Sequence, residues 1–210
     1  MGKGRVRNSE TAKAAILRAA EELFAERGFS GVSISSIAER SGSSGPLIMF
    51  HFRSKKGLYS AVKKSIMDRY CRHLVQKPSE ASSFRSFLQD ILEGMISFYK
   101  LNPSLVKLSK WSMLEGECEP WPGEADWHHL YLERIEQARQ RGEIRGDISP
   151  FRFMVIITGA VHFWCEYHDH FLHDLGYDNK NGEEDEKYIA ELESLLLNGL
   201  LADTQAKQSQ

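Results

Sequence analysis

The spacing of apolar residues constrains this chain most, because it is helical almost from end to end. Between Ile16 and Phe24 the apolar residues return every three or four positions, and the same period recurs in later segments. No credible run alternates apolar and polar residues as a half-buried strand does. The sequence therefore predicts an all-α fold.

Capping residues and helix breakers divide the pattern into segments. Serines stand where successive N-terminal helices should start, and Gly28 stands where the first should end: Ser9, Ser33, Ser43 or Ser44, and Ser54. After a break at residues 77–79, helices are expected at about 82–101, 104–114, 125–142, 150–172 and 185–202. The tail from Asp203 should be frayed. We predict two domains, 1–77 and a larger helical domain, 78–210.

Composition excludes several classes of protein. Of the 210 residues, 41% are hydrophobic and 27% charged, as in an ordinary globular protein. No apolar stretch follows the basic start, and the longest uncharged run, 153–165, is shorter than the roughly 20 residues that span a bilayer. We expect a soluble, cytoplasmic protein. Cys71, Cys118 and Cys165 show no CxxC spacing; we interpret them as reduced thiols, with a redox-sensing pair as the alternative.

The charge is distributed unevenly along the chain. Residues 1–77 carry a net charge of +9 and residues 78–210 one of −11, although the whole chain carries only −2. A basic first third suggests that this part meets a polyanion. A solvated basic surface without a partner explains the charge equally well.

Two short helices separated by Ser41-Gly42 suggest a helix-turn-helix, the motif that places its second helix in the major groove of DNA. Four apolar side chains should point inward and fix the angle between these helices: Ile34, Ile37, Ala38 and Ile48. A generic three-helix core could show the same pattern.

The order of particular residues is more specific. The stretch 16–24 followed by Gly28-Phe29, then Ser33-Ile34 and 37–42, resembles the opening of the TetR family of transcription regulators. Residues 50–58, Phe-His-Phe-Arg-Ser-Lys-Lys-Gly-Leu, resemble that family's aromatic-His-Phe-x-Ser-Lys-x-x-Leu ending. The resemblance covers about residues 10–62, and beyond it only the helical outline matches. It implies a helix-turn-helix at about 34–53, with residues 45–50 as the recognition helix.

By position in the family pattern, ten residues are expected to contact double-stranded DNA: Ser35, Ser36, Ser44, Gly45, Pro46, Leu47, Met49, Phe50, His51 and Lys55. Serine hydroxyls and helix N-terminal amides suit phosphate oxygens, and Lys55 adds a positive charge at the start of the fourth helix. His51 could donate to a phosphate or be a structural histidine.

The chain departs from the family pattern in two ways. Met49 stands where relatives usually carry a tyrosine that contacts a phosphate. Gly45-Pro46-Leu47 offers no polar side chain to base edges, so contacts there could only be apolar, for instance with thymine methyl groups. DNA shape, Ser35, Ser44 or a flexible basic arm at 3–7 could add specificity.

The segments 150–172 and 185–202 correspond to the family's last two helices, which form a four-helix bundle with a second subunit. Independently, residues 153–161 are apolar nearly all round, and Gly159 with Ala160 would permit close helix approach. Leu192 and Leu196 belong to an apolar stripe in the last segment. We expect a homodimer and a pseudo-palindromic operator, with an intramolecular core as the alternative.

An effector pocket is expected to be lined by aromatic and apolar residues of the second domain: Met95, Phe98, Trp111, Met113, Trp127, Tyr131, Phe163 and Tyr167. Such a lining suits an aromatic or amphipathic small molecule, although each residue could equally be plain core. His162, Glu166, Asp169 and His173 fall on one helical face and are weak candidates for a divalent metal site, with His128 and His129 as further donors. We expect no metal and no cofactor.

Taken together, these features predict a repressor that a small molecule releases from its operator. A ligand-dependent activator or dual regulator of the same fold is the alternative, and a DNA-packaging protein without a ligand is a further one. The sequence contains no GxSxG, HExxH, P-loop or dinucleotide-binding glycine pattern, so we do not expect an enzyme.

Overall fold

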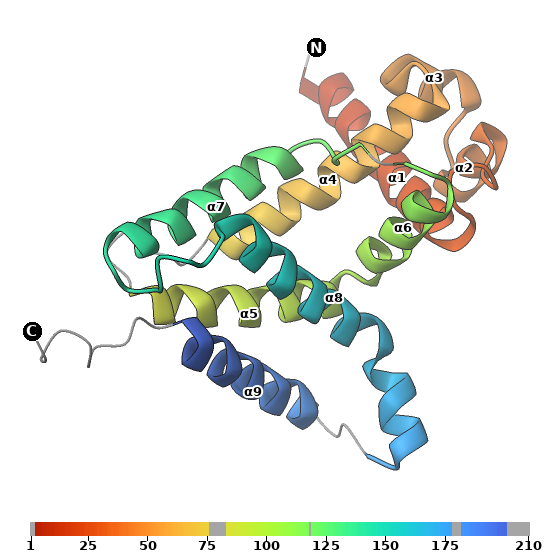
Figure 1. Cartoon of the computed structure of the whole chain (residues 1–210). Coiled ribbons are helices and arrows are strands. Elements are labelled where there is room, and N and C mark those ends of the chain that lie inside the picture. Colours follow the sequence, from red (N-terminus) through yellow and green to blue (C-terminus); the bar gives the residue numbers. More distant parts are fainter. Residues whose placement is uncertain (1–2, 76–82, 118, 178–181, 201–210) are drawn as a thin grey trace, which may run out of the picture. The chain divides into compact units, whose positions relative to one another are not determined.

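The structure, a computed structural model, describes residues 3–75, 83–117, 119–177 and 182–200. Within these ranges its nine elements are all α-helices (Figure 1). They are α1 (Lys3–Arg27), α2 (Ile34–Ser41), α3 (Gly45–Phe52), α4 (Lys55–Val75), α5 (Phe84–Leu101), α6 (Pro103–Leu114), α7 (Glu124–Gln140), α8 (Pro150–Leu175) and α9 (Glu183–Leu200). The predicted all-α class is confirmed. None of these helices is long and apolar enough to cross a membrane.

The chain divides into two compact units. The first combines the chain up to Tyr70 with Asn102–Ala125, and the second combines Cys71–Leu101 with the chain from Asp126. Helix α6 therefore belongs to the first unit, because it packs on α1. The division into functional domains at residue 77 stays a prediction. The expected break at 77–79 and the tail from Asp203 lie outside the described residues.

Local signals set the helix boundaries of the first unit. The side chains of Ser33 and Ser44 accept hydrogen bonds from the first turns of α2 and α3, and Ser54 accepts one from the amide of Gly57 in α4. The expected start of the first helix near Ser9 is wrong, since α1 begins at Lys3. No proline stands between Lys3 and Ser9, so the backbone amides of this segment can all take part in the helix. The arm at 3–7 is accordingly helical.

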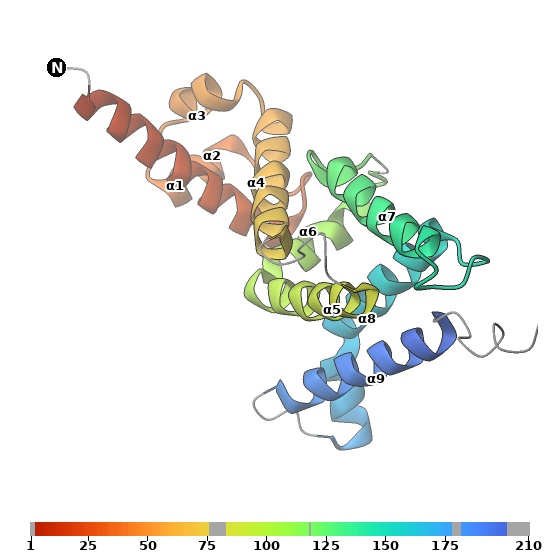
Figure 2. The same ribbon diagram turned by 90° about the vertical axis from the view of Figure 1, so that its left-hand side faces the viewer.

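The core of the first unit lies where α1 packs against α2, α3 and α6 (Figure 2). Ile16, Leu23 and Phe24 of α1 are fully buried there. Gly28 ends α1 in the left-handed conformation, with φ at 69°. A Cβ atom at this position would also lie 2.8 Å from the ring of Trp111 on α6, so both backbone and space require glycine.

In the second unit, α8 and α9 both pack on α5. Helix α8 places Phe153, Ile157 and Val161 in this core. A buried carboxylate fastens the three helices, because Asp185 of α9 pairs with Lys100 of α5 and accepts a hydrogen bond of 2.7 Å from Trp164 Nε1 of α8. These contacts hold α8 in place and leave its opposite face outward.

Candidate nucleic-acid interface

The turn between α2 and α3 fixes the second helix of the motif. Gly42 takes φ 64°, and its N–H points back to the last carbonyls of α2. Ile37 of α2 and Ile48 of α3 are both fully buried. Ile34 and Ala38 are only half-buried. Of the four side chains predicted to point inward, the other two are therefore the more deeply buried. This arrangement is the helix-turn-helix that the sequence predicts.

The outward face of α3 is mostly apolar. Met49 and Phe50 lie three and four positions after Pro46, on one side of the helix, and Arg53 follows the last residue of α3; all four are exposed. The side chain of Phe50 is 79% exposed and that of Met49 43%. Ile48 and Phe52 are buried on the other side. The exposed face therefore offers apolar groups and one guanidinium.

Serine hydroxyls lie at the N-terminal ends of both helices of the motif. Ser33 and Ser36 exchange hydrogen bonds in a capping box on α2, and exposed Ser35 lies 2.8 Å from the hydroxyl of Ser33. Ser44 accepts from the amide of Leu47 at 3.3 Å. Because the hydroxyl of Ser36 already donates to the Ser33 carbonyl at 2.8 Å, Ser35 and Ser44 are the better placed for a phosphate.

Lys55, expected at a phosphate, makes contacts within the chain. Its ammonium donates to the carbonyls of Phe29 and Val32, each at 2.8 Å, and lies 4.3 Å from the centre of the Phe29 ring. Two of its three N–H groups are thereby used. This geometry gives Lys55 a role in holding the turn between α1 and α2, and its phosphate contact stays a prediction.

Glu115, at the end of α6, holds the same turn from the other side. Its carboxylate accepts hydrogen bonds from the backbone amides of Phe29 at 3.1 Å and Ser30 at 2.9 Å. Burial raises the pKa of this carboxyl, but these hydrogen bonds outweigh burial and lower the pKa below its ordinary value. Sequence reasoning missed Glu115, because its partners lie more than 80 positions away.

The remaining predicted contacts lie at or near the surface of α3. Gly45 and Leu47 are half-buried. His51 is half-buried as well, and its Nε2 atom is buried without a hydrogen bond to the described residues. Sequence reasoning missed Arg53, which ends the outward face of α3 and has φ 67°, unusual for a residue with a side chain. Its spacing of seven from Pro46 was the available signal.

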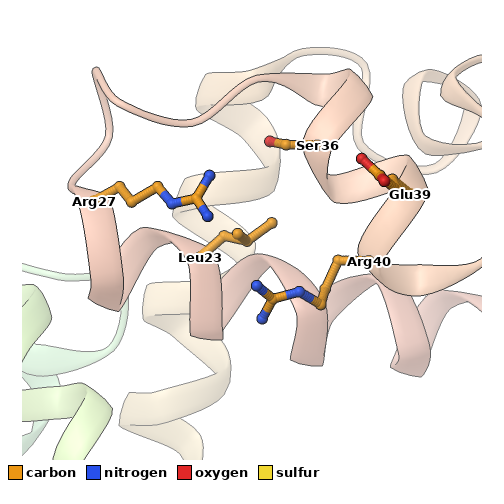
Figure 3. Close-up of a pocket in the computed structure, with 5 residues that line it drawn as sticks. All are labelled: Leu23, Arg27, Ser36, Glu39 and Arg40. Atoms are coloured by element: carbon orange, nitrogen blue, oxygen red, sulfur yellow. The ribbon is translucent and has the colours of Figure 1, made fainter.

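A polar hollow of about 240 Å³ opens between α1 and α2. Figure 3 shows the residues that line it: Leu23 and Arg27 come from α1, and Ser36, Glu39 and Arg40 come from α2. Arg40 pairs with Glu22 at 3.2 Å and with Glu26 at 3.6 Å. The charges in and around this hollow are mixed, so it does not favour an anionic ligand.

The predicted effector-binding residues are divided between the two units, and the pocket stays a prediction. Trp111 and Met113 belong to the first unit, where Trp111 lies against Gly28 and Met113 is exposed. The others belong to the second unit: Met95, Phe98 and Tyr131 are buried, Trp127 is half-buried, and Phe163 and Tyr167 are exposed. The sequence pattern does not distinguish α6, which packs on α1, from the helices of the second unit.

Tyr131 is a buried residue of this set whose hydroxyl could bind a ligand. Its ring lies 5.4 Å from that of Phe87 and 6.1 Å from that of Trp127, measured between centroids. Its hydroxyl is buried and makes no hydrogen bond to the described residues. Burial raises the pKa of Tyr131, so the hydroxyl stays protonated as a potential donor.

The candidate metal ligands are not gathered. His162 and Glu166 approach to 4.0 Å, but Asp169 lies against His168 at 3.1 Å instead of joining them. His173 is exposed. In the part of the chain that the structure describes, no three histidine, cysteine or acidic side chains are placed to share a metal ion.

Helix α8 carries an exposed apolar stripe that winds around it, because each four-residue step overshoots one turn by about 40°. Its members follow each other at intervals of four residues and are exposed: Phe151, Val155, Phe163, Tyr167, Phe171 and Leu175, with Gly159 completing the series. The Phe163 ring stacks on that of Tyr167 at 4.8 Å. On α9, Leu195 is exposed, Leu192 and Leu196 are half-buried, and Leu197 is buried against the core.

Comparison with known proteins places this arrangement in a family. Residues 16–62 match the model of bacterial regulatory proteins of the tetR family, and residues 88–189 match a C-terminal domain described as tetracyclin repressor-like. The transcriptional repressor ComR of Escherichia coli K12 is 32% identical over 141 residues, which cover 65% of this chain and 67% of ComR. The chain belongs to the TetR family. It is a DNA-binding transcriptional regulator with a helix-turn-helix.

Other proteins match over shorter stretches or by fold. The transcriptional activator FasR of Mycolicibacterium smegmatis is 32% identical over 83 residues, covering 40% of this chain and 38% of FasR, so the match spans under half of that relative. The regulator SCO4942 of Streptomyces coelicolor superposes with a TM-score of 0.74 at 18% identity, over 88% of this chain and 97% of SCO4942. AibR, solved with isovaleryl coenzyme A and operator DNA, superposes with a TM-score of 0.67 at 18% identity, over 90% of this chain and 99% of AibR.

Proposed function

We propose that this TetR-family regulator is a homodimeric repressor that binds a pseudo-palindromic operator and leaves it when a small molecule binds. The exposed face of α3, held on a helix-turn-helix and preceded by serine-capped helix ends, is the observation that carries the DNA-binding part. The net charge of +9 over residues 1–77 supports it. Its place of action would be the cytoplasm, where a bacterial regulator meets DNA.

The apolar stripe on α8 supports the homodimer. Exposed aromatic rings at four-residue steps leave a long strip of carbon surface in water, which a second copy would cover. Gly159 in the middle of the stripe has open space around it, so a partner helix could approach closely there. A two-fold symmetric dimer presents two α3 helices, and these require an inverted repeat in the DNA.

Tyr131 supports an effector site in the second unit. A buried hydroxyl without a partner costs free energy that a ligand oxygen or nitrogen could recover by pairing with it. The rings of Phe87 and Trp127 around it suit an aromatic or amphipathic molecule. Such a molecule shifts the protein only if it binds the DNA-free state more tightly than the DNA-bound state.

The sign of regulation has two candidates. ComR is named a repressor and FasR an activator, so relatives of both kinds resemble this chain. We favour repression because ComR matches over the longer stretch. A reporter gene placed behind the operator decides: expression should fall when the protein is present, and a rise would establish the activator alternative.

The experiment for DNA binding is selection from a random duplex pool with the purified full-length protein. We expect an enriched inverted repeat whose half-sites lie about one helical turn apart. Binding should weaken steeply with salt, since neutralised phosphates release counterions. Retention of no duplex at low salt would contradict the proposal. For the effector, Tyr131→Phe should weaken release from the operator by a small molecule without changing operator affinity.

A further inference from the structure

We propose that the outward face of α3 reads thymine by its 5-methyl group, through apolar contacts of Met49 and Phe50. The inference deepens the proposed function and rests on it, because α3 must first enter the major groove. It concerns what the protein recognises there, and the residues involved all belong to the first unit.

Helix α3 has few side chains that can form hydrogen bonds. Of its eight residues, Gly45–Phe52, only His51 has a polar side chain, and the Nε2 atom of that histidine is buried. Base edges in the major groove are usually distinguished by arginine, asparagine, glutamine or lysine. None of these occurs within α3, so hydrogen bonds cannot be its main means of reading bases.

Helix α3 exposes apolar side chains instead. Phe50 is 79% exposed and Met49 43%, and Pro46 lies one turn before them on the same side. An α-helix with its side chains is about 10–12 Å in diameter, which fits the major groove, about 12 Å wide. A helix placed there along this face would bring both side chains against base edges.

The bases differ in what they offer to such a face. Thymine alone carries an apolar group in the major groove, whereas the other bases show donors and acceptors that would lose their water against a phenyl ring or a thioether. Burying one methyl group is worth about a fourfold gain in affinity. The apolar face therefore favours thymine, and 5-methylcytosine would present the same methyl group.

The guanidinium of Arg53 is available for a phosphate contact beside this apolar face. Arg53 lies at the end of the same face, and no ion pair or hydrogen bond engages its guanidinium among the described residues. A guanidinium there suits the phosphate backbone, which carries charge but no sequence information. Bases would thus be read by carbon surface on α3, and phosphates by the charge of the residue that follows this helix.

Deoxyuridine separates methyl reading from every other form of readout, because it pairs like thymidine and lacks only the methyl group. The probes are the duplex selected from the random pool and its copies with single thymidines replaced by deoxyuridine. We expect an approximately fourfold loss of affinity at one or two thymidines of each half-site. Replacing the equivalent thymidine in both half-sites should cost about fifteenfold.

Variants assign the effect to residues. Phe50→Ala and Met49→Ala should each abolish the difference between thymidine and deoxyuridine at the position that the removed side chain contacts, and the double variant should abolish it everywhere. Both side chains are exposed enough to be removed without unfolding. Arg53→Asn is the matched control, since asparagine tolerates the left-handed backbone. It should weaken both duplexes equally and keep their ratio. In the double variant, 5-methylcytosine should have no effect where it replaces cytosine beside α3.

Equal affinity for the thymidine and deoxyuridine duplexes at every position would overturn methyl reading while leaving DNA binding intact. So would salt-dependent binding with no sequence enriched by selection. A thymidine preference that survives undiminished in the double alanine variant would assign the reading elsewhere and overturn it too. Failure to bind any duplex would instead remove the proposed function.

Discussion

Two exposed apolar faces, on α3 and on α8, consist of similar residues and differ in their surroundings. The face of α3 is short, since its apolar part runs only from Pro46 to Phe50, and it is bordered by Ser44 and Arg53. The stripe on α8 runs from Phe151 to Leu175, about 36 Å at 1.5 Å per residue. The first is short enough for the proposed contact with DNA, and the second is long enough to cover a helix of its own length.

Charge separates the two faces further. Residues 1–77 carry +9 and residues 78–210 carry −11, so a nucleic acid is attracted to the first and repelled by the second. An apolar side chain on the surface therefore does not indicate its partner by itself. The length of the apolar run and the sign of the charge around it indicate whether DNA or a second copy of the protein covers it.

The largest effect is expected where a charge enters the longer face. Phe163→Glu puts an unpaired carboxylate in the middle of the α8 stripe of each subunit, and two-fold symmetry repeats it. We expect the dimer dissociation constant to rise by roughly a thousandfold or more, measured by sedimentation. Phe163→Leu keeps the stripe apolar and should stay dimeric. If Phe163→Glu sediments as a dimer at the same concentration, the stripe is not the dimer interface.

A smaller effect is expected at Lys55, which lies behind α3. Lys55→Ala leaves the carbonyls of Phe29 and Val32 without their donor, so the free energy of unfolding should fall by about 2–3 kcal/mol. Lys56→Ala, at the exposed neighbouring position, should leave it unchanged. Chemical denaturation measures both variants.

The same variant tests which charges near α3 reach DNA. For Lys55→Ala the slope of affinity against salt should stay that of the unmodified protein, whereas Arg53→Asn should make it shallower by about one unit. A shallower slope for Lys55→Ala would restore the phosphate contact that the sequence pattern predicts.

Local signals predict the fold of this chain well and its contacts poorly. Helix caps depend on residues that are close in sequence, as at Ser33, Ser44 and Ser54. The starts of α2, α3 and α4 could therefore be predicted within a few positions. The role of Lys55 depends on carbonyls 23 and 26 positions away. For the same reason the sequence did not show that Trp111 and Met113 belong to the first unit, where α6 packs on α1.

Met49→Tyr tests whether Met49, on the shorter face, contacts a base. A phenol there could donate to a phosphate, which is worth up to about tenfold in affinity on any duplex. The selected duplex should gain less, because the thioether contact with a base methyl group is lost, so the preference for it over unrelated DNA should fall. Titration of both duplexes at one salt concentration measures this. An equal gain on both would confine base reading to Phe50.

The smallest effect is expected for Gly159→Ala. Whether this change stabilises the protein or weakens the dimer indicates whether Gly159 lies in the contact between subunits. Gly159 lies inside α8, and a Cβ atom there would meet nothing within 4 Å in the single chain. In a monomer, Gly159→Ala should therefore stabilise the helix by about 0.5–1 kcal/mol. In a dimer whose helices approach closely at this glycine, the added methyl group would hold the two α8 helices apart and offset that gain.

Comparing two backgrounds separates these contributions. In the monomeric Phe163→Glu protein, Gly159→Ala should raise the free energy of unfolding by that amount. In the dimeric protein, the same change should raise the dimer dissociation constant instead. A similar gain in both backgrounds would mean that Gly159 lies outside the contact, although the aromatic part of the stripe could still form it. A loss in the monomeric background would mean that the single chain already fills the space beside Gly159, and the stripe would then lack its close approach.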